Sequence, residues 1–150
     1  LLIQFPGKIT LDYFKQVEQI LQKMQELDDL NKWKKAVEFR HASWYIGESW
    51  ELLDEYGAAM VLHDIPKSRM FDVRGKAGFV YMRFHGPKGD YRDGYTDEFL
   101  ATKAKEIVCW GEQGKDVYIY FNNTVGSAFD NARSLQVMIE QQRSGTICYI

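Results

Sequence analysis

Short apolar runs alternate along the chain with longer segments whose apolar residues recur at helical spacing. The apolar runs cover residues 1–5, 35–41, 58–65, 78–85 and 116–122. Their near-continuous apolar character is typical of strands buried on both faces, as in a parallel sheet. The intervening segments predict amphipathic helices that begin near Thr10, span 49–56, and begin again near Thr96 and Ser127.

Capping signals support these helix boundaries. Thr10 and Thr96 are suitable N-cap residues, and Ser127 with Asp130 forms a pair that resembles a capping box. Gly57 follows the short second helix, as glycine often does at a helix end. The alternation of strands and helices predicts an α/β fold with a parallel sheet covered by helices.

Composition narrows the class of protein. The chain has 150 residues with 45% hydrophobic and 15% aromatic content, enough for one domain with a core. A formal net charge of -2 argues against a broad basic surface that binds nucleic acid. It does not argue against a cleft that is basic only locally. Two cysteines are too few for a disulfide framework, and no apolar run is long enough for a membrane span. With no signal-like segment, a cytoplasmic protein is expected.

Polar residues gather where the predicted strands end. Alternation along a strand places Glu38 and Arg40 on one face of the second strand, and Arg83 with His85 on one face of the fourth. The other strand ends carry His63, Asp64, Asn122 and Asn123. Barrels and open parallel sheets both bind ligands at the carboxyl ends of their strands, so we expect a site there. A purely structural ion pair around Glu38 remains the alternative.

Three stretches of sequence resemble a known family. VEFRHASWY, RFHGPKGDYRDGYTDEFL and VYIYFNN occur in order, and the match runs over nearly the whole chain. In them the chain resembles the YecE-like family, also called the domain of unknown function 72 family. The motif residues that the resemblance brings into the site are Glu38, Arg40, His41, Trp44, Arg83, His85, Gly86, Tyr91, Tyr95, Asn122 and Asn123. Asp64 stands where the family tends to place an acid, whereas His63 does not belong to the pattern.

The resemblance implies a TIM-like (β/α) barrel. We therefore expect residues 1–150 to form one domain, a partial barrel of about five parallel strands with covering helices. A full barrel takes about 250 residues. The strands that precede this part of the barrel, roughly three of them, are then expected to be missing at the N-terminus. The activity of the family is not settled, so the resemblance brings no reaction.

The favoured chemistry is a metal-free enzyme that acts on a small anionic or sugar-like substrate. Arg40 and Arg83 would bind a phosphate or carboxylate through forked hydrogen bonds. His85 would transfer a proton, and Glu38 would act as a base or orient another group. Asp64 is expected to be a third catalytic residue beside them. Substrate contacts are also expected from Tyr91, Tyr95, Asn122 and Asn123.

Two alternatives stay open. A metal-dependent phosphodiester hydrolase or isomerase would use Glu38, Asp64 and His85 as ligands, although the arginines would compete for the carboxylates. A non-catalytic module would bind nucleic acid or another ligand through the loop at 86–95, which mixes lysine, arginine and tyrosine. Neither GxGxxG nor GxxxxGKS/T occurs, so no nucleotide cofactor is expected.

A phosphate site is a further expectation for the segment 122–127. It joins the last strand to the helix that begins near Ser127, where barrels often bind phosphate through backbone amides.

Overall fold

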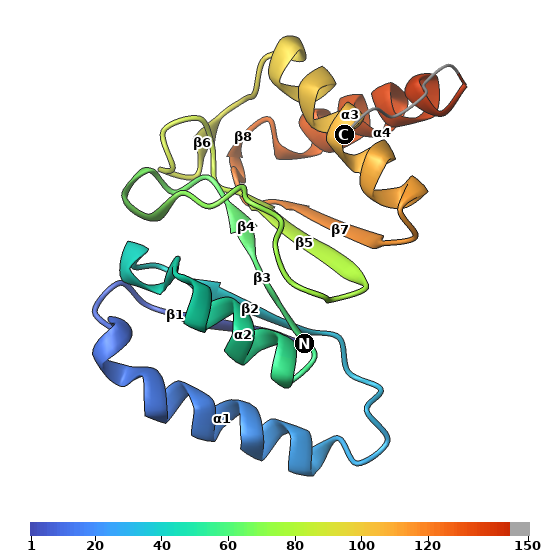
Figure 1. The fold of residues 1–150 in the computed structure, drawn as a ribbon. Helices are drawn as coiled ribbons and strands as arrows, with labels where there is room; N and C mark the ends of the chain where they lie inside the picture. Colours follow the sequence, from blue (N-terminus) through green and yellow to red (C-terminus); the bar gives the residue numbers. More distant parts are fainter. Residues whose placement is uncertain (145–150) are drawn as a thin grey trace.

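The computed structural model describes residues 1–144, and the fold alternates strands with helices (Figure 1). The strands and their bounds are β1 (Leu2–Phe5), β2 (Lys35–Phe39), β3 (Ala58–Met60), β4 (Leu62–His63), β5 (Phe79–Phe84), β6 (Arg92–Asp93), β7 (Asp116–Phe121) and β8 (Val125–Gly126). The α-helices are α1 (Phe14–Leu27), α2 (Gly47–Glu55), α3 (Asp97–Glu112) and α4 (Ala128–Arg143). Three short 3-10 turns are η1 (Leu11–Tyr13), η2 (Ala42–Trp44) and η3 (Pro66–Ser68).

The larger strands are all parallel and follow one another in chain order. One sheet has the order β1-β2-β3 and a second has the order β4-β5-β7. Only Val61 separates β3 from β4, and its N–H donates to the carbonyl of Val37 at 2.8 Å, so the chain passes directly from the first sheet into the second. Glu38 then stands opposite Gln4 on β1, and His63 stands opposite Arg83 on β5.

Helices cover one side of this curved array. In Figure 1, α1 and α2 lie below β1 and β2, and α3 and α4 lie above β5 and β7. The side chains of Phe39 and Phe84 point to the helix side, as alternation predicts. Phe39 stacks on Trp44 at 4.2 Å between ring centroids, and Phe84 contacts the Phe99 ring at 5.6 Å.

Contacts across the inner face show that the strands curve strongly. Neighbouring strands lie about 4.8 Å apart, so β2 and β7, three positions apart, would be separated by roughly 14 Å in a flat sheet. Nevertheless, the ammonium group of Lys34, just before β2, forms an ion pair with Asp116 at the start of β7. The same ammonium group donates to the hydroxyl of Tyr118 at 3.1 Å. Within residues 1–144 the sheets do not close, because the outer edges of β1 and β7 pair with no strand.

The expected elements are confirmed, but some of the expected caps are wrong. The Thr10 hydroxyl donates to Asp12 and caps no backbone amide, and a 3-10 turn precedes α1. Ser127 makes no side-chain cap for α4, so the expected capping box is absent there. Thr96 does cap α3, since its hydroxyl accepts from the Phe99 N–H at 3.3 Å.

The loops after β5 and β7 contain a strand pair that the sequence pattern did not reveal. β6 and β8 pair in parallel, with Arg92 opposite Val125 and Asp93 opposite Gly126. Gly86 enters this region with a φ of +95°, and a Cβ atom there would collide with the carbonyl of Arg92. Glycine at 86 is therefore required both by the backbone conformation and by the lack of space.

Replacing Gly86 with alanine is expected to destabilise the fold. We expect Gly86→Ala to lower the free energy of unfolding by about 1–3 kcal/mol through backbone strain alone, with the clash adding to this loss. The measurement is the midpoint of urea unfolding. Gly111→Ala is the matched control, because an added Cβ there meets no atom within 4 Å inside α3. The control should raise stability by up to about 1 kcal/mol, and equal effects of the two substitutions would contradict the assignment.

Candidate functional site

The charged residues that the sequence placed at separate strand ends form one connected group. Glu38 and Arg40 come from β2 and its end, Arg83 and His85 from β5 and its end, and Asp64 follows β4. The group lies on the inner face of the curved strands, at their carboxyl ends. Alternation within each strand accounts for which side chains share this face, and the curvature brings β2 close enough to β5 for contact.

Glu38 is the buried centre of this group. Its side chain is fully buried, and its Oε2 accepts a hydrogen bond from Arg83 Nη1 at 2.6 Å. Its Oε1 forms an ion pair with Arg40 Nε that lacks hydrogen-bond geometry. Gln4 Oε1 accepts from Arg83 Nη1 at 3.0 Å and from Arg40 Nη2 at 3.3 Å. The carboxylate of Glu38 therefore orients both arginines.

Asp64 and His85 form a second pair beside it. Asp64 Oδ1 accepts from the backbone N–H of His85 at 2.8 Å and from His85 Nδ1 at 3.1 Å. Its Oδ2 accepts from the hydroxyl of Tyr95, which in turn accepts from the Gly86 N–H at 2.6 Å. Burial alone would raise the pKa of Asp64, but these hydrogen bonds lower it below its usual value. Asp64 is therefore a fixed carboxylate that orients the His85 ring.

The two pairs meet at the other nitrogen of His85. Arg40 Nη2 lies 3.0 Å from His85 Nε2. An arginine nitrogen only donates, so Nε2 accepts and the proton of the neutral ring is on Nδ1, facing Asp64. The ring of Tyr91 lies perpendicular to that of His85 at 5.4 Å between centroids, and Tyr91 has a left-handed φ of 67°. The relay from Tyr95 to Asp64, His85 and Arg40 is thus continuous.

His63 lies beside this relay, but both of its ring nitrogens form hydrogen bonds with the backbone, so its role is structural. Its Nε2 donates to the Phe39 carbonyl at 3.0 Å, and its Nδ1 accepts from the Ile65 N–H at 3.3 Å. The hydroxyl of Tyr45 contacts Nε2 at 3.1 Å. Burial lowers the pKa of His63 to about 4. His63 is therefore a neutral residue that joins β2 to β4.

Asn122 and Asn123 do not join the charged group. Asn123 is fully buried and its Nδ2 donates to the carbonyl of Asp93 at 2.8 Å and to Asn131 Oδ1 at 3.2 Å. Asn123 therefore anchors the β6–β8 loops, whereas the Oδ1 atom of Asn122 is buried without a hydrogen-bond partner. The Ser127 N–H donates to the carbonyl of Asp93 at 3.3 Å, so this amide is not free for a phosphate.

Some motif residues support the site from outside, and sequence reasoning missed two other residues near it. Trp44 donates to the Ile9 carbonyl at 2.8 Å, and His41 Nδ1 accepts from the Ser43 N–H. Gln4 and Tyr45 were missed, because neither lies in a polar run at a strand end. The only available signal for Gln4 was that a lone polar residue interrupts an apolar strand.

The geometry does not favour a divalent metal at the expected ligands. Among residues 1–144, no three His, Cys, Asp or Glu side chains group together so as to hold an ion. Both oxygens of Glu38 face arginines, and both oxygens of Asp64 accept hydrogen bonds from His85 or Tyr95. A metal would have to displace these partners.

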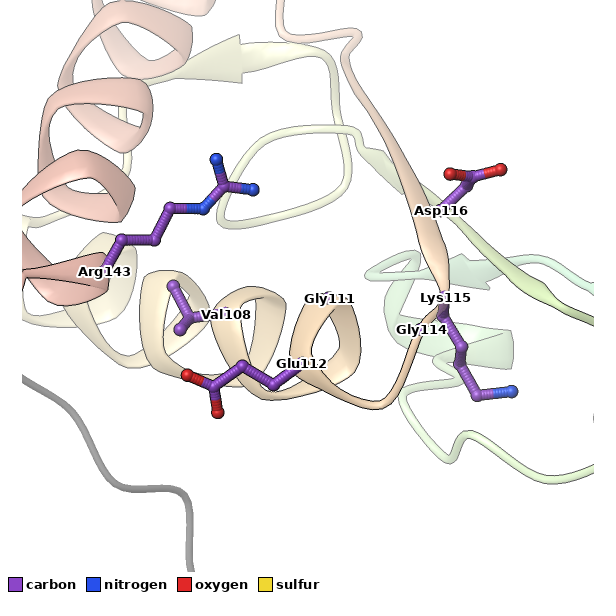
Figure 2. A pocket seen from close by; sticks show the side chains of 7 residues that line it. All are labelled: Val108, Gly111, Glu112, Gly114, Lys115, Asp116 and Arg143. Carbon is purple, nitrogen blue, oxygen red and sulfur yellow. The ribbon is translucent and has the colours of Figure 1, made fainter.

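A separate hollow of about 500 Å³ lies at the opposite end of β7 (Figure 2). Its lining comes from the last turns of α3 and α4 and the start of β7, including Glu112, Asp116 and Arg143. Figure 2 shows that the carboxylate of Glu112 points away from the guanidinium of Arg143. Because its polar groups do not converge, this hollow is not the candidate site.

Comparisons with known proteins identify relatives but no activity. The family model described as "Protein of unknown function DUF72" matches residues 1–147. A crystal structure of a DUF72 family protein from Thermotoga maritima MSB8 shares 28% identity with a TM-score of 0.68, covering 96% of this chain and 57% of that one. A DUF72 family protein from Enterococcus faecalis V583 shares 20% identity with a TM-score of 0.69, covering 97% of this chain and 61% of that one, and shows the fold alone. No curated protein matches the chain.

The structure bears on two expectations, that the chain has no membrane span and that its cysteines form no disulfide. Within residues 1–144, no helix combines the length and apolar character that crossing a bilayer requires. Cys109 is disulfide-bonded, so the expectation that the cysteines are reduced is wrong at this position. Cys148 lies outside the described residues.

Removing the charge of Glu38 is expected to destabilise the protein strongly. Glu38→Gln leaves two guanidinium groups close together without their carboxylate, and breaking a buried ion pair costs about 3–5 kcal/mol. Glu26→Gln is the control, because Glu26 forms an exposed ion pair with Lys23. Its loss should change the free energy of unfolding by about 1 kcal/mol at most. Similar effects in urea unfolding would mean that Glu38 is not the buried anchor.

The free energy of unfolding is expected to decrease as the pH is lowered, because His63 is buried in its neutral form. Its pKa is about 4 in the folded protein and 6.5 ordinarily, so the folded state binds fewer protons. The contribution is complete above pH 6.5 and is lost as the pH falls towards 4, by up to about 3 kcal/mol. In His63→Gln, which keeps a donor for the Phe39 carbonyl, unfolding free energies measured at pH 7 and 4.5 should differ less than in the wild type. An unchanged difference would contradict this role of His63.

Proposed function

The chain belongs to the DUF72 family, and we propose that it is part of a TIM-like barrel enzyme that acts on a small anionic or sugar-like substrate without a metal. The proposal has an architectural and a chemical part. The observation that carries it is the continuous relay in which Asp64 orients His85, while His85 Nε2 faces an arginine held by Glu38.

Curvature and strand order support the barrel. Parallel strands in chain order, with helices on the outer side only, are the arrangement of a (β/α) barrel, whereas a doubly wound sheet has helices on both faces. The contacts from Lys34 to Asp116 and from Gln4 to Arg83 cross the concave face. The solved relatives are longer than this chain, which spans 57% and 61% of their lengths. The remaining strands of such a barrel would pair with the free edges of β1 and β7.

The charge distribution supports an anionic substrate. Glu38 is completely buried, while the side chains of Arg40 and Arg83 keep 11% and 15% of their surface exposed. Around Glu38, two guanidinium groups face one buried carboxylate, so positive charge is in excess on the Arg40 and Arg83 side of the group, while the charge of Asp64 lies on the far side of the His85 ring. Arginine forks suit a phosphate or carboxylate, and a fixed charge costs no reorganisation when the substrate binds.

Proton transfer would fall to His85. Arg40 Nη2 now donates to His85 Nε2. If a bound anion accepts this hydrogen bond instead, His85 Nε2 becomes free to accept a proton from the substrate. Asp64 would stabilise the ring cation that results, and Tyr95 would hold Asp64 in place. The Tyr91 ring beside His85 offers a face for a sugar-like ring.

The two alternative functions have weaker support. A metal-dependent hydrolase would need Glu38 and Asp64 to release their present partners. A nucleic-acid module would use the loop at 86–95. In this loop the ammonium group of Lys88 forms an ion pair with the carboxylate of Asp93, with 3.7 Å between Nζ and Oδ2, and Asp90 adds a further negative charge. These acids reduce the attraction of the loop for phosphates.

Binding of inorganic phosphate and malonate tests the anion site. We expect Arg83→Lys to weaken binding by about tenfold, because lysine keeps the charge next to Glu38 but loses the fork. The measurement is isothermal titration calorimetry, and bound phosphate should also shift the His85 ring resonances in NMR spectra. The control is Arg74→Gln, since Arg74 is exposed and pairs with Asp72 away from the site.

Two results would refute this proposal. One is that neither anion binds at millimolar concentration. The other is that Arg83→Lys binds as tightly as the wild type.

A further inference from the structure

A second cavity lies on the outer side of Asp64. Its volume is about 310 Å³, and its walls include Asp64, Arg69, Phe71, Pro87, Tyr95 and Phe99. This volume falls within the range of small-molecule pockets. The cavity is distinct from the charged group on the inner face, because neither Arg40, Arg83 nor His85 contributes to its lining.

Three aromatic side chains, Phe71, Tyr95 and Phe99, contribute to the walls of this cavity. Tyr95 and Phe99 stack at 4.8 Å with an interplanar angle of 20°. The ammonium group of Lys103 lies 4.1 Å from the centroid of Phe71, which stabilises that ring in its position. Rings held in this way give the cavity a preformed apolar wall that suits a flat apolar body.

Besides its rings, the cavity is lined by two charged side chains, Arg69 and Asp64. Arg69 is exposed, and within the described part of the chain it pairs with no carboxylate. Asp64 is fixed by three hydrogen bonds, two on Oδ1 and one on Oδ2. Since a carboxylate has about four acceptor positions, one position on Oδ2 is left for a further donor. Arg69 and Asp64 form no ion pair with each other, so the cation and the acceptor remain separate.

We propose that this cavity binds a planar aromatic carboxylate that carries a hydrogen-bond donor at its far end. The carboxylate would pair with Arg69, the ring would lie among Phe71, Tyr95 and Phe99, and the donor would reach Asp64 Oδ2. A carboxylate at the Asp64 end would be repelled, so the two ends of the ligand are distinguished. The cavity shares Asp64 and Tyr95 with the anion site proposed above, but its lining includes none of the groups that would bind the anion or transfer the proton there, Arg40, Arg83 and His85.

The probe for this cavity is 4-hydroxybenzoate, measured by calorimetry or ligand-observed NMR. Arg69→Gln is expected to weaken its binding by about 10- to 100-fold, the value of a charge-assisted hydrogen bond. Because Arg69 is exposed, the variant should keep the melting temperature of the wild type. Arg92→Gln removes another exposed arginine, outside the cavity, and should leave binding unchanged. 4-Hydroxybenzamide, which keeps the hydroxyl donor and lacks the negative charge, should bind at least tenfold more weakly.

Further variants separate this cavity from the inner site. Arg83→Lys, which is expected to weaken phosphate binding, should leave 4-hydroxybenzoate binding unchanged. Phe71→Leu should weaken 4-hydroxybenzoate binding and leave phosphate binding unchanged. The proposal is overturned if 4-hydroxybenzoate fails to bind at millimolar concentration, binds equally well to Arg69→Gln, or loses affinity in Arg83→Lys.

Discussion

The buried carboxylate of Glu38 is the interaction on which the arrangement of the candidate site depends. A fully buried charge is costly unless it is paired, and Glu38 faces one arginine from its own strand and one from β5. This requirement joins two strands that are not neighbours in the sheet. It also fixes where the two guanidinium groups lie relative to His85.

The same constraint explains how the site combines charge with burial. If Glu38 were exposed, the arginines would be mobile surface groups of small energetic value. Held from beneath by Glu38 and from the side by Gln4, they present donors in fixed positions. Such preorganised donors are what anion recognition requires. The structural and functional interpretations of the ion pair are therefore not in competition, because one carboxylate serves both.

Like Glu38, Asp64 serves two parts of the molecule at once. On the inner side it orients His85, and on the outer side it forms part of the aromatic cavity beside Tyr95. Tyr95 accepts from the Gly86 N–H, so the loop after β5 is connected to the same carboxylate. The obligatory glycine at 86, the left-handed Tyr91 and the β6–β8 pair thus stabilise the surroundings of the relay.

The sequence by itself determined the larger strands, the α-helices and which residues stand at the strand ends, because period-two and helical spacing are local properties. It placed Glu38 with Arg40 and Arg83 with His85, since alternation follows from the pleat. Only the tertiary structure decided that Gln4 joins the arginines, that His63 is packing, and that Asn123 anchors a loop. Those roles depend on which residues the curvature and the loop pairing bring together, and such contacts between distant segments leave no periodic signal. Burial likewise decided that Glu38 is an anchor beneath the arginines, because its depth depends on how β2 and β5 approach each other.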